Sequence, residues 1–415
     1  MKIVKTISIV LGTIIALGAW VAFTIFGAFL GWWMKPIATP DDHDAFIEKA
    51  TTAIASNNLG NTAFVLIENG EVVGEYYAQS GRNIDSHTAF PTASFSKWIT
   101  ALGVNALADQ GRIDLDAPVS TYLSRWHLPE TGYNNDGVTI RRLLSHTAGL
   151  TDGLGFADFG TDEDIPALED SLFNPRASSG EDVVIAVGAE PGESFAYSGG
   201  GYLILQLLIE EVSGQSFEDF IDETILSPLD MRESSFTFIG DIPNATASFT
   251  VTGVEAPQYK YAALGATGFS SSASDLTKLV KAMIASTPSF GVTTETLTSM
   301  RAPIAYVFGS PIWGSGPMLF APTGAGDYIY GHDGANEPAI NVSVRINPIT
   351  NDAYIMLVNG HPSLASDIGG EWVLWQSGIP DFLSTERALA SALKPAAIGS
   401  VIILLVIAFF IRRSR

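Results

Sequence analysis

The chain has 415 residues, of which 47% are hydrophobic and 16% are charged, and its formal net charge is −22. It contains no cysteine, which excludes a disulfide framework, a thiolate nucleophile and a cysteine-ligated metal. The excess of acidic residues disfavours nucleic acid and anionic lipid headgroups as partners, because both carry negative charge.

The first predicted element is an apolar segment at residues 6–34, between Lys5 and Lys35, which contains no charged residue. About 20 apolar residues span a bilayer, so the segment predicts a transmembrane anchor that follows a cytoplasmic stub at residues 1–5. Its length, and the lack of a small-residue cleavage site before Pro36, favour an uncleaved anchor. A cleaved signal sequence is the alternative.

Two hairpins and a helical region are predicted between the ends of the chain. Residues 41–57 predict a helix, and residues 63–77 predict a β-hairpin with Asn69-Gly70 as its two-residue turn. Residues 94–286 are rich in helical patterns. They include an acidic, glycine-rich stretch at 151–194 that predicts a long loop.

Strand patterns return near the end of the chain, at residues 340–346 and 353–358, and predict a second hairpin. Strands at both ends with helices between them predict an α+β fold. We expect a central antiparallel sheet, formed by both ends of the domain and flanked by helices.

Ser94 and Lys97 lie one turn apart at the start of a predicted amphipathic helix that ends at Gly111. Serine is a weak nucleophile until a base removes its proton, and a lysine in a water-poor site can act as that base. Ser94 would also lie near the positive end of the helix dipole. By itself the spacing also fits a surface serine beside a solvated lysine.

Two further stretches carry candidate site residues. Tyr197 follows turn residues and precedes a predicted helix at 203–212, so its phenol could exchange a proton with a serine. His332 lies in a glycine-rich stretch at 328–335, predicted to be an edge strand that a substrate backbone can approach. His332 could bind a substrate carbonyl or carboxyl group, or support the phenol. The histidines show no metal-ligand spacing, so neither a metal nor a cofactor is expected.

The last predicted element is an apolar segment at residues 396–411, followed by a basic tail at 412–415. It is short for a membrane span, although Lys394 and Arg412 could extend it by snorkelling. An interfacial tail is the alternative. If both apolar segments span, the basic residues place both termini in the cytoplasm and the middle of the chain outside it.

The motifs together resemble the serine β-lactamase/penicillin-binding superfamily, in the branch of class C β-lactamases, related esterases and D-amino-acid peptidases. The resemblance covers about residues 45–378 and is carried by Ser94-x-x-Lys97, Tyr197-Ser-Gly199 and His332-Asp-Gly334. Family-like stretches also occur at residues 106–119, 139–150, 211–217, 228–231 and 272–276. The resemblance implies a mixed α/β domain at 45–378 with an all-helical lobe and an active site in the groove between them.

The resemblance also implies roles for these residues. Ser94 would be the acylated nucleophile, Lys97 its base and Tyr197 the proton shuttle, with His332 as a further catalytic residue. The backbone N–H groups of Ser94 and Ala335 would form the oxyanion hole, and Gly199, Asp333 and Gly334 would line the substrate site.

The sequence departs from the family pattern at two positions. Gly199 replaces the asparagine of Tyr-x-Asn, and His332-Asp333-Gly334 replaces Lys-Thr-Gly. Loss of the lysine weakens a β-lactam or a D-Ala-D-Ala peptide as substrate, because no cation pairs with its carboxylate, and loss of the asparagine weakens amide substrates generally. The negative charge of the chain also disfavours anionic substrates, unless Arg142 or Arg345 compensates.

We therefore expect a membrane-anchored serine hydrolase at the inner membrane, with its catalytic domain on the periplasmic side and a small-molecule or peptide substrate. Ester or D-amino-acid peptide hydrolysis is favoured over β-lactam hydrolysis. The alternatives are a penicillin-recognising receptor and a non-catalytic wall-binding module. The short cytoplasmic ends disfavour the receptor, and the intact Ser94, Lys97 and Tyr197 disfavour the binding module.

Overall fold

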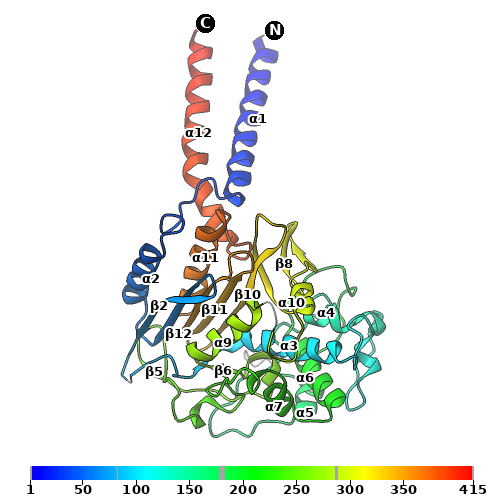
Figure 1. The fold of residues 1–415 in the computed structure, drawn as a ribbon. Coiled ribbons are helices and arrows are strands. Elements are labelled where there is room, and N and C mark those ends of the chain that lie inside the picture. Colours follow the sequence, from blue (N-terminus) through cyan, green and yellow to red (C-terminus); the bar gives the residue numbers. More distant parts are fainter. Residues whose placement is uncertain (1, 82, 177–182, 286–287, 414–415) are drawn as a thin grey trace.

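An eight-stranded antiparallel sheet joins the two ends of the domain in the computed structural model, which describes the chain except residues 1, 82, 177–182, 286–287 and 414–415. Figure 1 shows the sheet between helices, with two long helices projecting from one end of the domain. In spatial order the strands are β2 (Glu71–Ala78), β1 (Thr62–Glu68), β12 (Asp352–Asn359), β11 (Ile340–Asn347), β10 (Tyr328–Asn336), β9 (Met318–Pro322), β8 (Ser310–Trp313) and β7 (Ala305–Val307). The α+β prediction is confirmed.

The pairing of β1 with β12 brings the ends of the domain together, with Phe64 opposite Met356. Both predicted hairpins are present, as β1–β2 and β11–β12. The turn of the first has φ of 49° at Asn69 and 81° at Gly70. Both values are left-handed, which a two-residue hairpin turn of type I′ requires and which Asn-Gly readily adopts.

Helices cover both faces of the sheet. The α-helices are α1 (Lys2–Phe29), α2 (His43–Asn57), α3 (Ser96–Asp109), α4 (Ile140–Leu144), α5 (Leu168–Phe173), α6 (Gly200–Ser213), α7 (Phe217–Ile221), α8 (Leu264–Thr267), α9 (Ala273–Ile284), α10 (Thr294–Met300), α11 (Leu364–Ser377) and α12 (Thr385–Arg413). Side chains of a strand alternate between faces, so β1 serves two cores. Phe64 and Leu66 pack with α2 and α11, whereas Val65 and Ile67 face the core that contains α3 and α6.

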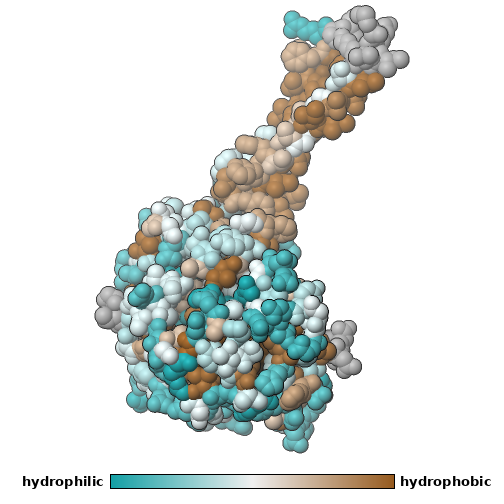
Figure 2. All heavy atoms as spheres, turned by 90° about the vertical axis from the view of Figure 1, so that its right-hand side faces the viewer, coloured by the Kyte–Doolittle hydropathy of each residue, from teal (hydrophilic) through white to brown (hydrophobic). Residues whose placement is uncertain are grey.

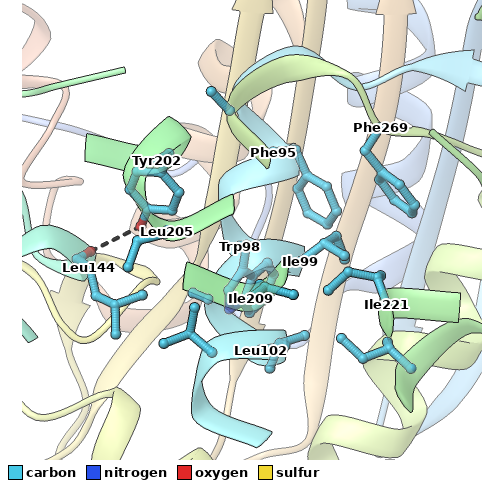
Figure 3. Close-up of a cluster of buried hydrophobic side chains, with 14 of the residues drawn as sticks. Phe95, Trp98, Ile99, Leu102, Leu144, Tyr202, Leu205, Ile209, Ile221 and Phe269 are labelled. Carbon is cyan, nitrogen blue, oxygen red and sulfur yellow. Dashed lines mark hydrogen bonds between the residues drawn. The ribbon is translucent and has the colours of Figure 1, made fainter. Parts of the chain in front are cut away.

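Helix α3 is the centre of the larger core (Figure 3). Every residue from Ser96 to Leu107 is buried, so the prediction of a helix is confirmed but its amphipathic character is wrong. Polar side chains of the helix bond to backbone carbonyl groups in the interior: the Thr100 hydroxyl donates to the Gly265 carbonyl, and the Asn105 amide donates to the Ala101 carbonyl. Figure 3 also shows the Tyr202 hydroxyl of α6 donating to the Leu144 carbonyl.

The predicted loop at 151–194 lies over the helical lobe and contains only one short helix, α5, among its described residues. The predicted helix at 203–212 is α6, which begins three residues earlier at Gly200. The earlier start matters for the site, because the first residue of α6 lies only three residues after Tyr197.

The projecting helices α1 and α12 contact each other along their length (Figure 1). By length and composition, Ile7–Phe29 and Thr385–Arg413 are both apolar enough to cross a membrane. Helix α12 begins 11 residues before the predicted segment at 396–411 and continues through Pro395, so the second segment is longer than expected. The Trp20 indole donates to the Pro395 carbonyl at 3.2 Å. Figure 2 shows hydrophobic residues gathered along the helix pair and a mainly hydrophilic domain surface.

Candidate active site

Ser94 lies in a 3₁₀ turn, Ala93–Phe95, that leads directly into α3. The backbone of Ala93 is left-handed, with φ of 49°, a conformation that costs a non-glycine residue roughly 1–2 kcal/mol. Hydrogen bonds on both sides hold it: the Thr92 hydroxyl donates to the Phe269 carbonyl, and the Ser96 hydroxyl donates to the Ala93 carbonyl. The turn leaves Ser94 partly accessible at the N-terminal end of a buried helix.

Lys97 is fully buried, and its amine faces Ser94. The Nζ atom lies 3.3 Å from Ser94 Oγ and 2.8 Å from the Ala266 carbonyl oxygen. Three aromatic rings enclose the amine, with centroids at 5.0 Å for Tyr197 and 5.7 Å for both Phe156 and Tyr202. The predicted pair is therefore in hydrogen-bond contact inside a largely apolar enclosure. Such a contact lets a proton pass between the hydroxyl and the amine.

Tyr197 comes from the segment before α6 and packs its half-buried ring beside Lys97. The ring stacks on His146 with centroids 4.4 Å apart, and it also contacts Trp313. Three segments that are distant along the chain thus meet at the amine of Lys97. The hydrogen bond from the Tyr197 phenol to Ser94 stays a prediction.

His146 and Asp152 hold the segment that carries Tyr197, and sequence reasoning gave neither residue a role in the site. The Ser198 N–H donates to His146 Nδ1 at 3.1 Å, and the Ser198 hydroxyl donates to Asp152 at 2.6 Å. Asp152 also accepts from the Gly200 N–H at the start of α6. Burial, with smaller effects from Lys97 and His332, lowers the pKa of His146 well below its usual value. The ring is therefore neutral and carries its proton on Nε2.

Gly199 cannot carry a side chain in this structure. A Cβ atom there would lie 1.5 Å from the carbonyl oxygen of Leu154. The Gly199 N–H donates to the Gly153 carbonyl at 2.7 Å, so the loop after Asp152 occupies the space beside this position. This loop therefore leaves no room for the side-chain amide that an asparagine at position 199 would supply.

The stretch around His332 is strand β10, which is not an edge strand as predicted. It pairs with β11 over Tyr330–Asn336, and with β9 over Tyr328–Gly331. Only its last residues, beyond the end of β9, face the Ser94 turn. A Cβ atom at Gly334 would lie 2.1 Å from the Thr92 carbonyl oxygen and 3.2 Å from the Ser94 nitrogen. The glycine therefore allows β10 to lie directly against the turn that carries Ser94.

His332 is completely buried. Its Nδ1 atom lies 2.6 Å from the Asp333 carbonyl oxygen, and its ring contacts Trp313 and Phe95. Burial lowers the pKa of His332 to about 3, although the bond to Asp333 opposes that shift. A neutral, enclosed imidazole cannot pair with a substrate carboxylate as an imidazolium would.

Of the two cations suggested to compensate for the negative charge, Arg345 is neutralised by carboxylates, whereas Arg142 bonds to a backbone carbonyl and its role stays a prediction. Arg345 is 1% exposed and pairs with Asp333 at 2.9 Å and with Asp381. The pairing with Arg345 engages Oδ2 of Asp333, whereas its Oδ1 has no hydrogen-bond partner among the described residues, so the expected role of Asp333 in substrate binding stays a prediction. Arg142 donates to the Gly137 carbonyl at 2.7 Å.

Two cavities flank the site, and neither wall includes Ser94. One, of about 910 Å³, is bounded by Phe156, the ring beside Lys97, and by Phe159 and Ile185. The other, of about 540 Å³, reaches Glu337 and Pro338, just beyond β10. Among the described residues, no group of three or more His, Asp or Glu side chains is arranged to hold a metal ion.

The chain also matches a known protein family. The Beta-lactamase family model matches residues 46–378, which is most of the chain. The chain belongs to the β-lactamase family.

Relatives with curated descriptions match a shorter segment. Penicillin-binding protein 4* of Bacillus subtilis is 33% identical over 179 residues, which are 42% of this chain and 37% of that protein. Protein flp of Staphylococcus aureus is 27% identical over 190 residues, which are 44% of this chain and 36% of that protein. The matched segments thus span little more than a third of these relatives.

Solved structures of other proteins superpose over most of the chain. A penicillin-binding protein homologue from Pyrococcus abyssi has a TM-score of 0.64 and 25% identity, covering 79% of this chain and 75% of that one. The D-amino acid amidase from Ochrobactrum anthropi SV3 has a TM-score of 0.62 and 19% identity, covering 85% of this chain and 99% of that one. The second likeness concerns the fold alone.

Proposed function

We propose that the protein is a serine hydrolase that forms an acyl-enzyme on Ser94. The observation that carries this proposal is the contact of 3.3 Å between Lys97 Nζ and Ser94 Oγ inside the aromatic enclosure. Ser94 is partly accessible, and a base within hydrogen-bond reach is what activates a serine nucleophile.

The proposed reaction has two steps. Ser94 Oγ attacks the substrate carbonyl while its proton passes to the Lys97 and Tyr197 pair, and the leaving group departs with a proton returned from that pair. Water then attacks the acyl-enzyme by the same route and releases the acid. The backbone N–H groups of Ser94 and Ala335 stabilise the oxyanion in both steps. The close approach of Gly334 to the Ser94 nitrogen supports this oxyanion hole.

We favour esters and D-amino-acid peptides or amides over β-lactams as substrates. A β-lactam or a D-Ala-D-Ala peptide presents a carboxylate, but Arg345 is paired with two carboxylates and His332 is neutral. The net charge of −22 also disfavours an anionic substrate.

We further propose that α1 and α12 anchor the protein in the inner membrane, with the domain at 45–378 on the periplasmic side. The apolar helices support the anchoring. The basic residues near both ends, Lys2, Lys5, Arg412 and Arg413, support the orientation, because such residues are enriched on the cytoplasmic side of membranes.

Turnover by the full chain in detergent tests the activity. We expect multiple turnovers with p-nitrophenyl esters or D-amino-acid amides, slower turnover with the carboxylate-bearing D-Ala-D-Ala peptides and nitrocefin, and none with the Ser94→Ala variant. A single stoichiometric acylation without turnover would instead indicate a receptor. Equal rates for the wild type and Ser94→Ala would refute the proposal.

A further inference from the structure

The hairpin formed by β7 and β8 exposes an aromatic side chain at its tip. Phe308 is 98% exposed, more than any other large hydrophobic residue in the described chain, and Tyr306 beside it is 53% exposed. The tip residues Phe308 and Gly309 both have left-handed backbones, with φ of 50° and 82°. This position favours Asn, Asp or Gly, and a bulky aromatic residue there is uncommon. Phe308 is thus unfavourable in two ways: its apolar ring is exposed to water, and its backbone is left-handed.

The hairpin lies at the end of the domain from which α12 departs. Ala305 and Val307 pack in one cluster with Phe382, three residues before α12 begins. The Phe382 N–H also donates to the Phe320 carbonyl of β9 at 2.7 Å. In Figure 1 the yellow loops beside β8 rise to the level at which α1 and α12 leave the domain. Near the base of α1, Phe26 and Trp32 are exposed as well.

The charge pattern of this segment differs from that of the rest of the domain. No charged residue occurs between Arg301 and Asp327, in a chain with 44 acidic residues. An acidic surface is repelled by anionic headgroups, whereas an uncharged one can approach them. Aromatic side chains favour the interfacial layer of a bilayer.

From these observations we propose that the β7–β8 tip is a second membrane contact, in which Phe308 inserts into the interfacial layer of the bilayer that α1 and α12 cross. This inference rests on the membrane anchoring proposed above. The contact would fix the orientation of the domain, because the helix pair alone permits the domain to tilt at the bilayer surface.

The contact would also set the height of the active site above the membrane. Trp313 ends β8 and packs on both His146 and His332. A strand rises about 3.3 Å per residue, so Trp313 lies roughly 17 Å along the hairpin from Phe308. The site would therefore meet substrates close to the membrane surface.

Site-directed spin labelling tests the contact, and the cysteine-free chain makes each introduced cysteine a unique attachment point. The full chain is placed in phosphatidylcholine nanodiscs with a nitroxide at Phe308→Cys. Phe173→Cys is the matched control, because Phe173 is 61% exposed in α5, at the far end of the domain from α1 and α12 (Figure 1). Leu405→Cys, on the exposed surface of α12, reports on the anchor. Tyr306→Cys is a second label on the hairpin.

Collision rates with oxygen and with a water-soluble nickel chelate separate the outcomes. We expect the oxygen-to-nickel ratio at Phe308 to exceed that at Phe173 several-fold, with Tyr306 intermediate and Leu405 highest. Labels at Phe308 and Tyr306 that are as accessible to nickel as the Phe173 label, with Leu405 in lipid, would overturn the hairpin contact and leave the anchor intact. A water-exposed label at Leu405 would overturn the anchor itself.

Discussion

Two buried basic side chains in this domain have opposite surroundings. Arg345 lies against Asp333 and Asp381, with its guanidinium 4.0 Å from the centroid of Phe320. Lys97 is equally buried, but its amine contacts a hydroxyl, a backbone carbonyl and three aromatic rings. A cation neutralised by two carboxylates joins parts of the fold. A buried amine whose contacts are neutral groups remains available for chemistry. The surroundings of the two side chains, rather than their burial, distinguish the structural Arg345 from Lys97, which is proposed to be catalytic.

Replacing Lys97 by Met should have the largest effect on activity. Methionine is similar in length to lysine and suits an apolar enclosure, but it has no amine, so Ser94 loses its base. We expect kcat/KM for an ester substrate to fall roughly 10²–10⁴-fold, with the urea midpoint of unfolding preserved or raised. A variant with more than half of the wild-type rate would contradict the assignment of Lys97.

Replacing Arg345 by Met should reverse this pattern. The change leaves Asp381 buried without its cation, and breaking such a pair costs about 3–5 kcal/mol of folding free energy. Denaturant unfolding measures that loss. Activity per folded molecule should stay close to wild type, because Arg345 is proposed to have no catalytic role. Stability that matches the wild type would show that the pair contributes little.

Replacing Tyr197 by Phe keeps the ring beside Lys97 and His146 and removes only the phenol. We expect a fall of at least about 10²-fold in kcat with little change in unfolding free energy. Phe195, from the same segment, offers a control: Phe195→Leu removes a neighbouring ring but no proton donor. If both variants lost activity equally, packing rather than proton transfer would explain the effect of Tyr197.

His332 should make the fold sensitive to acid. Its pKa is about 3 in the folded state, against roughly 6.5 in an unfolded chain, so the unfolded state binds more protons between these values. The free energy of unfolding should therefore fall as the pH drops below about 6.5, by up to about 1.4 kcal/mol per pH unit. Urea unfolding at pH 7, 6 and 5 should show a shallower slope for His332→Asn. An unchanged slope would mean that His332 titrates normally.

The sequence predicted those features whose cause is local. Asn69-Gly70 indicated its hairpin, because few other residue pairs adopt two successive left-handed conformations. The spacing of Ser94 and Lys97 predicted their contact, because one helical turn brings them together wherever the helix lies. One non-local feature was also predicted, a sheet formed by both ends of the domain, because strand patterns occur at both ends; the pairing of β1 with β12 within it was not.

Features that depend on distant segments were missed or mistaken. Helix α3 seemed amphipathic because its polar residues resemble a solvated face, whereas carbonyl groups from residues 265 and 266 meet Thr100 and Lys97 in the interior. Arg345 seemed available to a substrate, because nothing near it in sequence indicates its partner Asp381. Asp152 lies in a stretch that was predicted only as a loop, and its contact with Ser198 spans 46 residues.

The most direct test of the central claim is the site of covalent modification. The full chain is treated with a fluorophosphonate and analysed by mass spectrometry of its peptides. We expect one adduct, on the peptide that contains Ser94, and its loss in both Ser94→Ala and Lys97→Met. An adduct that persists in Ser94→Ala, on another serine, would contradict the account.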